Sequence, residues 1–435
     1  MLLILIPSVT SRVQYIFSLL LKEMLGLEFS VITDCDEWMA YQGPKFNYAK
    51  VPAGDALFIE SSELLFETGI FPHELKTFMH GEIPVLFKSE NSHSALSFDP
   101  FAAAFYMVSR YEEYHREKKD KYGRFVASES IAWQGIFFDI PVVHYWTDIL
   151  ESLLIKHFPK IPVRRPEYRF IPTIDIDHAY AYRGRNLTRS LGGVGRSLVK
   201  ADFSEIILRT KVLWGFAQDP YDNYEYICRV HKEYGLRPLS FILFADYGGN
   251  DNQISLANKD FRKLLLALDQ IGTVGIHPSL SSNRHSEKLI SEFRGLSDVL
   301  GHDVVISRQH FLKISFPKTY RSLIQIGITD DYSMGYASHL GFRAGIAIPY
   351  CFFDLSRNEP TNFRIHPVAV MDVTLKDYLR LNPQQSQEII RQVIRKIKSV
   401  NGTFVSLWHN ESLSDMGRWK GWREVYEELL REATG

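Results

Sequence analysis

Residues 168–178 read YRFIPTIDIDH, a largely apolar run that ends in two aspartates, Asp175 and Asp177. On a strand, residues two apart point to the same side, so Thr173, Asp175 and Asp177 share one face and the isoleucines between them pack on the other. Two carboxylates side by side repel each other unless a cation lies between them or one of them carries a proton. The stretch therefore predicts a strand whose end carries a metal ligand next to a general base.

Beyond this stretch, apolar runs of strand length alternate with amphipathic runs of helical length. The predicted strands are Arg169–Ile176, Leu239–Phe244, Thr273–Ile276, Val304–Ser307, Gly327–Thr329, Ala344–Ile348 and Thr403–Leu407. The predicted helices are Asp222–Tyr234, Lys259–Ile271, Ser286–Leu300 and Gln384–Val400. Strands separated by helices predict a parallel sheet, and this number of strands predicts an α/β barrel or a doubly wound sheet.

Polar side chains with acid–base or metal-binding chemistry follow several of these strands. They are His277, Arg308, His310, Asp331 and His409. The carboxyl ends of the strands of a parallel barrel form one mouth, where catalytic groups gather. We therefore expect these side chains to lie close to the aspartate pair.

The first 160 or so residues also alternate short apolar runs with helical patterns, without a recognisable catalytic set. The predicted elements are strands at Met1–Pro7, Ser30–Thr33, Ala56–Ile59 and Pro84–Phe87, and helices at Val13–Leu25 and Phe101–His115. The charged residues 114–125, YHREKKDKYGRF, predict a solvated, flexible loop. The two prolines of KIPVRRP, Lys160–Pro166, disfavour helix. We therefore place a boundary there, between a smaller α/β domain (1–163) and a second domain (164–435).

Composition excludes several classes of protein. The chain has 50 basic and 51 acidic residues, a formal net charge of -1, which gives no long-range attraction to nucleic acid or to an anionic membrane. Three widely spaced cysteines predict neither a disulfide framework nor a thiolate metal site, and they favour a reducing, cytoplasmic location. The apolar start MLLILIP lacks the basic residues and cleavage site of a signal peptide. No apolar stretch reaches the roughly 18 to 20 residues that span a bilayer.

Other catalytic motifs are weak in this sequence or do not occur. Leu191–Gly195 resembles part of a phosphate loop, but the lysine and the preceding strand are missing, so we expect a flexible loop. The sequence contains neither GxSxG nor HExxH, the usual markers of serine hydrolases and zincins.

Read in order, the strand-end motifs resemble the metal-dependent polysaccharide deacetylases, a carbohydrate esterase family with a distorted (β/α) barrel. The matching segments are Thr173–Asp177, His277–Ser281, Arg308–His310, Asp331–Ser333 and Leu407–His409, and together they span roughly residues 169–411. The resemblance implies hydrolysis of an N- or O-acetyl group on a carbohydrate, with a divalent ion, usually zinc. It does not extend to the amino-terminal domain.

Carried over by position, the resemblance gives each matching residue a role. It makes Asp175 the general base, held by Arg308, and His409 the general acid, with Asp331 also in the catalytic set. It makes Asp177 and His277 metal ligands.

Two positions depart from the family pattern. The family's aspartates are commonly adjacent, whereas Ile176 separates them here, and Ser281 stands where the family has a second histidine ligand. Serine is a poor zinc ligand, which leaves His310 and His178 as candidates for the third position. We prefer His310 because it also follows a strand.

Two other functions fit the same pattern. A deacetylase-like domain without catalysis could bind glycan or a protein partner, a reading that Ser281 supports. A glycoside hydrolase without a metal could instead pair Asp331 with Asp175 or Asp177 as its two carboxylates. The sequence gives no indication of the oligomeric state.

Overall fold

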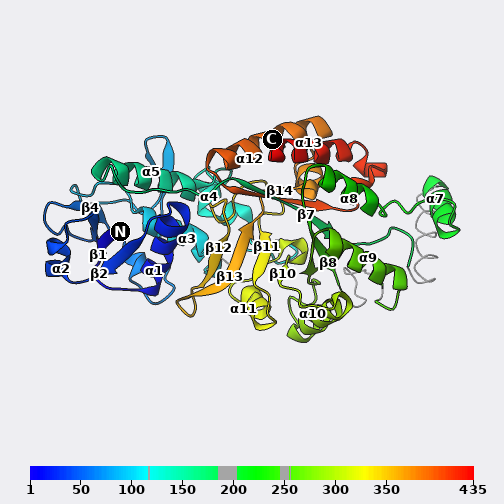
Figure 1. Ribbon diagram of the computed structural model, residues 1–435, viewed down its shortest axis with the longest axis horizontal. Helices are drawn as coiled ribbons and strands as arrows, with labels where there is room; N and C mark the ends of the chain where they lie inside the picture. The colour runs from blue at the N-terminus through cyan, green and yellow to red at the C-terminus, as the bar shows by residue number, and fades with distance from the viewer. Residues whose placement is uncertain (116–117, 185–202, 245–253, 255) are drawn as a thin grey trace.

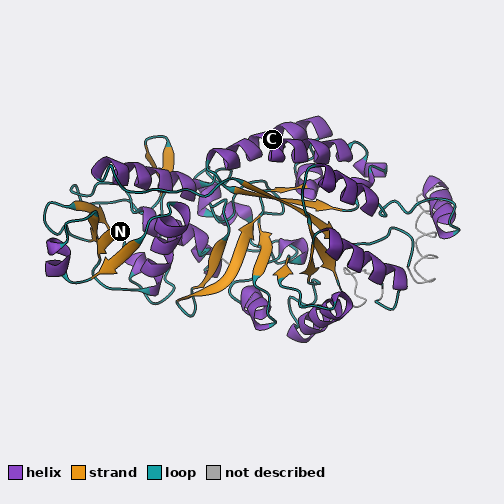
Figure 2. Cartoon of the chain, in the orientation of Figure 1, coloured by secondary structure: helices purple, strands orange, loops and turns teal. Residues whose placement is uncertain are grey.

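The computed structural model describes residues 1–115, 118–184, 203–244, 254 and 256–435. Within them, a four-stranded sheet near the amino terminus and a nine-stranded sheet built from residues 169–409 lie beside each other along the long axis of the molecule (Figure 1). Helices cover both sheets (Figure 2). The segment Leu191–Gly195 lies outside the described residues.

The amino-terminal sheet is parallel, with strand order β2-β1-β3-β4. Its central strand β1 is the apolar start of the chain, and all four of its residues are buried. The first helix begins after Thr10, whose side chain accepts a hydrogen bond from the Val13 N–H, and it continues as a wider π-helical turn. The strands are β1 (Leu2–Leu5), β2 (Phe29–Ile32), β3 (Lys45–Ala49), β4 (Leu57–Glu60), β5 (Phe78–His80) and β6 (Ile83–Val85). The helices and helical turns are α1 (Ser11–Phe17), η1 (Ser18–Met24), α2 (Cys35–Ala40), η2 (Glu63–Leu65), α3 (Pro100–Val108), η3 (Tyr111–Tyr114), η4 (Ala127–Glu129), α4 (Ile131–Gln134) and α5 (Val142–His157).

The larger sheet has the strand order β12-β13-β11-β10-β9-β8-β7-β15-β14. Every neighbouring pair is parallel except β12 and β13, which form an antiparallel hairpin at one edge. The strands are β7 (Arg169–Ile176), β8 (Leu239–Leu243), β9 (Thr273–His277), β10 (Ile306–Ser307), β11 (Asp330–Met334), β12 (Tyr350–Asp354), β13 (Glu359–Pro367), β14 (Val370–Met371) and β15 (Thr403–His409). In the described part of the chain no ladder joins β12 to β14, so the sheet curls into a partial barrel without closing. The expected α/β fold with a distorted barrel after a smaller α/β region is confirmed.

Helices flank the curled sheet on two sides. Figure 1 shows α8, α12 and α13 along one side and α9, α10 and α11 along the other. The helices and helical turns are α7 (Phe203–Leu213), α8 (Tyr224–Glu233), α9 (Lys259–Ile271), α10 (Ser286–Leu300), η5 (His310–Leu312), α11 (Lys318–Gln325), η6 (Thr374–Tyr378), α12 (Pro383–Ser399), η7 (Ser412–Ser414), η8 (Gly417–Trp419) and α13 (Trp422–Thr434).

Two predicted strands were wrong. Residues 327–329 are not extended as a strand, because the turn after α11 ends at Gly327, with φ 93°, and β11 begins only at Asp330. The apolar run Ala344–Ile348 is buried but is not a strand, because Gly345 has φ 66° and interrupts the extended backbone. Its apolar residues pack in a loop, which shows that an apolar run predicts burial more reliably than it predicts a strand.

The amino-terminal region packs against the hairpin β12–β13. The Tyr15 hydroxyl donates a hydrogen bond to the Cys351 carbonyl at 2.7 Å, and its ring lies 5.1 Å from that of Phe353. Arg12, which is fully buried, donates from Nε to Asn358 Oδ1 at 2.8 Å. One hydrophobic core runs through both regions, and a boundary near residue 163 stays a prediction.

Across the described residues, no helix has both the length and the apolar character that crossing a bilayer requires.

Candidate metal centre

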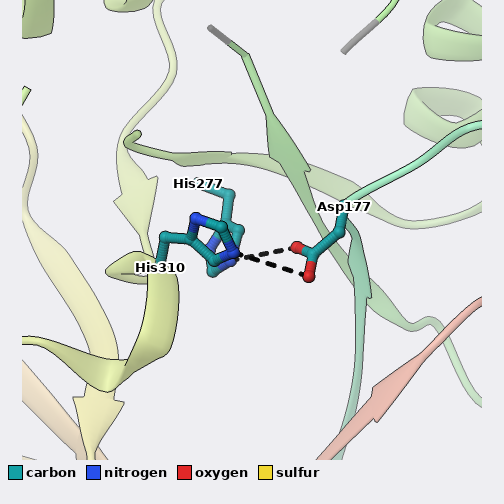
Figure 3. Close-up of side chains that lie close together, drawn as sticks. All are labelled: Asp177, His277 and His310. Atoms are coloured by element: carbon teal, nitrogen blue, oxygen red, sulfur yellow. Dashed lines mark ion pairs between the residues drawn. The ribbon is translucent and has the colours of Figure 1, made fainter. Parts of the chain in front are cut away.

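Three potential metal ligands meet beside the carboxyl ends of β7, β9 and β10. Asp177 follows β7, His277 ends β9 and His310 follows β10, and one donor atom from each lies within 4.8 Å of the others. The two imidazoles face the carboxylate from one side (Figure 3). His277 Nε2 lies 3.3 Å from Asp177 Oδ1, and His310 Nε2 lies 3.6 Å from Asp177 Oδ2. Donor atoms bonded at about 2.1 Å to a tetrahedral zinc ion are roughly 3.4 Å apart, so these separations suit such an ion.

The hydrogen bonding of His277 decides which ring nitrogen faces the carboxylate. Its Nδ1 lies 2.6 Å from the Arg308 carbonyl oxygen, which can only accept, so in the neutral ring that binds a metal Nδ1 carries the proton and Nε2 the lone pair. Within the described residues, Asp177 Oδ1 is a buried oxygen without a hydrogen bond. Two acceptors held against each other favour a cation between them. The donor set therefore fits a divalent ion, with a backbone carbonyl orienting one imidazole, as is usual around metals.

The ring of His310 is fixed by aromatic stacking. Its centroid lies 4.1 Å from that of Phe311, at an interplanar angle of 24°. Phe311 has φ 62°, an unfavourable conformation for a residue with a side chain, and Leu312 follows with φ 54°. This tight turn folds the chain back so that His310 is directed toward Asp177. In the absence of an ion, burial acts to raise the pKa of Asp177, but the imidazoles of His310 and His277, where they turn an N–H toward it, lower it well below its usual value.

Asp175 is held by the guanidinium of Arg308. Both side chains are almost fully enclosed, and Arg308 Nη1 donates to Asp175 Oδ1 at 2.7 Å. The same nitrogen donates to Thr173 Oγ1 at 2.5 Å, and Nε donates to the Tyr332 carbonyl at 2.8 Å. The guanidinium also lies over the ring of Phe241, at 4.5 Å. Asp175 Oδ1 is therefore occupied, while Oδ2 lies 3.9 Å from His277 Nε2 on the side of the candidate metal position.

His409 is paired with an aspartate that the sequence did not single out. Its Nδ1 donates to Asp372 Oδ1 at 2.8 Å, and its own backbone N–H donates to Asp372 Oδ2 at 2.8 Å. The other ring nitrogen, Nε2, lies 3.9 Å from Asp177 Oδ2. Burial acts to lower the pKa of His409, but the Asp372 carboxylate raises it to about 10.

Asp372 could have been found by the rule that found Asp177. It directly follows a short apolar strand, β14, whose two residues pair with β15 beside the site. A two-residue strand leaves too short an apolar run to stand out in the sequence. The position of Asp372 beside His409 is set by the sheet, because β14 and β15 are neighbours there.

Asp331 lies outside the cavity that these residues line. It is completely buried, and its carboxylate accepts hydrogen bonds from the hydroxyls of Ser307 and Ser333 at 2.9 and 2.8 Å. Burial raises the pKa of Asp331 to about 6. The Ser333 hydroxyl in turn accepts from the Gln309 N–H at 2.7 Å, so Asp331 supports the turn that carries His310. The sequence put Asp331 among the catalytic groups. Its hydrogen bonds in the structure instead support the turn that carries His310.

Ser281 and His178 are not part of the ligand group. Ser281 Oγ interacts with Ser279 Oγ at 3.1 Å and accepts from Lys288 Nζ at 3.3 Å, and it does not line the cavity. Among the described residues the ligand group is Asp177, His277 and His310, without His178. Of the two candidates that the sequence left for the third position, His310 lies beside Asp177 and His277, and its role as a ligand stays a prediction.

The candidate ligands and the His409 side chain open into one cavity of about 770 Å³. Its volume is in the range of small-ligand sites in proteins, roughly 300 to 1,000 Å³. The wall includes residues of the charged stretch that we expected to be a solvated loop. Those residues are Asp120, Lys121, Tyr122, Arg124 and Phe125. Arg124 is buried, so the expectation of a solvated loop was wrong for this part of the stretch.

Comparison with known proteins gives a family match for the amino-terminal region. Residues 2–159 match the model of a family of unknown function, DUF7033. No curated protein matches the sequence.

Among solved structures, the fold is similar to a protein from Mycobacterium smegmatis described as a polysaccharide deacetylase, with 13% identity and a TM-score of 0.41 over 62% of this chain and 85% of that one. It is also similar to Puue allantoinase, with 11% identity and a TM-score of 0.38 over 60% and 83% of the two chains. A third, from Pseudomonas aeruginosa PAO1 and described as a polysaccharide deacetylase, has 11% identity and a TM-score of 0.37 over 61% and 84%. Polysaccharide deacetylases are thus among the structures that this chain resembles, as its ordered motifs predicted. Likeness at this level concerns the fold alone, and the chemistry of the site depends on its own residues.

Proposed function

We propose that the protein is a metal-dependent hydrolase that removes an N- or O-linked acetyl group from a carbohydrate. One observation carries the proposal: a carboxylate and two imidazoles face a common point, flanked by a second carboxylate and a third imidazole. This arrangement combines three ligands for a cation with a separate base and a separate acid. Such a combination suits attack of water on an acyl carbon.

Asp177, His277 and His310 would hold a divalent ion, and zinc suits one carboxylate with two imidazoles. When bound, the ion would supply a Lewis acid that polarises the acyl carbonyl and lowers the pKa of a water molecule.

Asp175 would act as the general base. Arg308 holds its Oδ1, which leaves Oδ2 to accept the proton of the attacking water.

His409 would act as the general acid. Asp372 binds its Nδ1 and favours the protonated ring, so the Nε2 proton is available on the cavity side. Transfer of that proton to the leaving amine or alkoxide completes the cleavage of the acyl bond. We assign Asp372 and Asp331 to positioning, the first for His409 and the second for the turn that carries His310.

The test compares variants of the full chain loaded with zinc. Asp175→Asn and His409→Gln should each lower kcat for acetate release from chito-oligosaccharides or acetylated xylo-oligosaccharides by about 100-fold or more. Both variants should keep one equivalent of zinc, because neither residue is a ligand. Wild-type turnover in either variant would refute its role. Zinc retention without turnover in the wild type would instead support a glycan-binding domain.

The scarcity and spacing of the three cysteines, which form no disulfide in the structure, lead us to place the protein in the cytoplasm. The near-zero net charge gives no attraction to nucleic acid, and we propose a carbohydrate as the partner because the ordered motifs resemble those of polysaccharide deacetylases.

A further inference from the structure

We infer that the amino-terminal region supplies a specificity-determining wall of the active site, which admits a short glycan or the end of a glycan chain and excludes internal sites of a long polymer. This inference rests on the proposed function. The wall is carried by residues 118–126, here called the cavity loop, in which the lining side chains begin at Asp120. The loop belongs to the region matched by the family of unknown function.

The cavity loop is braced by its own hydrogen bonds. Asp120 Oδ1 accepts from the N–H groups of Tyr122 and Arg124 at 2.9 and 3.0 Å, and Oδ2 accepts from Arg124 Nε at 2.6 Å. The Gly123 N–H donates to the Asp120 carbonyl at 2.8 Å, and Gly123 has φ 79°, a conformation that glycine adopts without strain. Because one carboxylate closes the turn from both sides, the loop presents its side chains in a fixed arrangement.

Stacking connects the loop to a candidate metal ligand. The Tyr122 ring lies on the Phe311 ring with centroids 4.8 Å apart and an interplanar angle of 11°. Phe311 in turn stacks on His310. The loop therefore forms part of the same layer of rings that fixes one side of the site.

Arg124 joins the loop to two turns beside the site. Its Nη1 donates to the Phe311 carbonyl at 3.3 Å in η5, and its Nη2 donates to the Tyr378 hydroxyl at 3.1 Å in η6. The turn η5 begins at His310, and η6 begins two residues after Asp372. Arg124 thus links the amino-terminal region to the residue next to the candidate ligand His310 and to the helical turn that follows Asp372.

A buried charge network anchors the chain on both sides of the loop. Arg343, from the segment after β11, donates to both oxygens of Glu113 at 2.9 and 2.5 Å. Arg110 binds Glu112 and Glu113 at 2.7 and 2.8 Å, and the second oxygen of Glu112 accepts from the Ile131 N–H at 2.7 Å. Residues before and after the loop are therefore tied to the barrel or to each other.

The size and chemistry of the wall suit a short sugar chain. A cavity of about 770 Å³ is of the order that encloses a drug-sized ligand, and a short oligosaccharide is of that size. Tyr122 and the 40% exposed Tyr378 both line it, and aromatic rings with a polar tip can contact a sugar face and its hydroxyls. A polymer bound at an internal unit must leave the site in two directions, and the braced loop occupies one side of the cavity.

The experiment uses the full zinc-loaded chain and two pairs of probes. Triacetylchitotriose is compared with glycol chitin for amide-linked acetyl groups, and acetylated xylotriose with acetylxylan for ester-linked groups. We expect kcat/KM per acetyl group to be at least about tenfold higher for the short member of the pair that is accepted. Tyr122→Ala should raise KM for that short probe by about tenfold and leave kcat within about twofold, whereas Tyr122→Phe, which keeps the stack, should retain the wild-type KM.

Lys118→Ala is the matched control. Lys118 lies in the same loop, is 67% exposed and pairs with Glu129 outside the cavity, so its removal should leave both kinetic constants unchanged. Equal or better turnover of the polymer would overturn the inference, and so would an unchanged KM in Tyr122→Ala or a fall in kcat with loss of zinc.

Hydrolysis of p-nitrophenyl acetate distinguishes failure of this inference from failure of the proposed function. If the wild-type protein binds zinc and cleaves this ester but none of the short glycans, the inference fails and the proposed hydrolase chemistry stands. If it neither retains zinc nor cleaves any acetyl compound, the proposed function fails and the inference fails with it.

Discussion

Two buried clusters of charged or polar side chains lie near the cavity, and they differ in how their hydrogen bonds are completed. In the first, Arg110 and Arg343 face Glu112 and Glu113, and every carboxylate oxygen accepts a hydrogen bond. Although burial acts against ionisation, the two arginines lower the pKa of Glu113. All four carboxylate oxygens of this cluster thus find their donors within the chain, although Arg110 Nη1 is buried without a hydrogen bond among the described residues.

The second cluster is the ligand group Asp177, His277 and His310. It contains one carboxylate and two imidazoles, and His277 Nε2 lies 3.3 Å from an Asp177 oxygen that has no hydrogen bond within the described residues. Burying polar groups without partners costs free energy, so such a cluster persists when something outside the chain completes it. The contrast separates charges that hold the fold together from charges that are arranged for a ligand.

Removing one member of the first cluster should have the largest effect on stability. Arg343→Ala leaves Glu113 with one arginine in a closed site, and we expect the free energy of unfolding to fall by about 3–5 kcal/mol. The exposed pair Arg357–Glu359 provides the control, since Arg357→Ala should cost about 0–1 kcal/mol. Denaturant unfolding monitored by fluorescence measures both. A loss below about 1 kcal/mol in Arg343→Ala would show that the cluster is dispensable.

Removing a member of the ligand group should act on metal binding. Zinc at 100 times its Kd should stabilise the wild-type protein by about 2.7 kcal/mol, and Asp177→Asn should lose this increment while the metal-free stability stays equal or rises. Asp269, which pairs with His302 near the surface, gives a matched control: Asp269→Asn should keep the increment. Thermal unfolding with and without zinc or a chelator decides the outcome, and equal zinc stabilisation in both variants would contradict the ligand assignment.

Acid should distinguish a buried histidine from an exposed one on the same helix. His144, 3% exposed, accepts at Nε2 from the Ala347 N–H at 3.1 Å, and burial lowers its pKa to about 3. The unfolded chain, with a pKa near 6.5, takes up a proton first, so the stability that His144 gives is present above pH 6.5 and is lost as the pH falls toward 3. Between pH 7 and 5 the loss should be about 2 kcal/mol.

The measurement is denaturant unfolding of the metal-free protein at the two pH values. In His144→Gln the change between pH 7 and 5 should be smaller by that amount, whereas His157→Gln, at an exposed position of the same helix, should behave as the wild type. An unchanged pH dependence in His144→Gln would mean that this ring is already charged in the folded protein.

Ser281 should give the smallest effect. It occupies the sequence position of a family ligand but lies with Ser279 and Lys288 outside the cavity lining. Ser281→Ala should therefore leave zinc affinity within about twofold, measured by competition with a chelating dye. A loss of tenfold or more would place Ser281 at the metal and weaken the role of His310.

The curled sheet and its parallel core were predictable because strand-length apolar runs alternate with amphipathic helices. Arg169–Ile176 was placed to the residue, and His277 and His409 each end a strand. The edge hairpin β12–β13 was missed. Polar and apolar residues alternate in the later part of β13 but not in β12, which reads YCFFD. The two strands pair antiparallel, whereas the other neighbouring strands of the sheet are parallel.

The sequence by itself determined which residue types stand at the ends of the strands, because alternation along a strand and the shared direction of parallel strands are local rules. That was enough to bring Asp175, Asp177 and His277 to one mouth. Only the tertiary structure decided that Asp372 pairs with His409 and that Tyr122 forms part of the wall. Both contacts join segments that are far apart in the sequence. They are set by the packing of the whole chain, which the local spacing of residues does not predict.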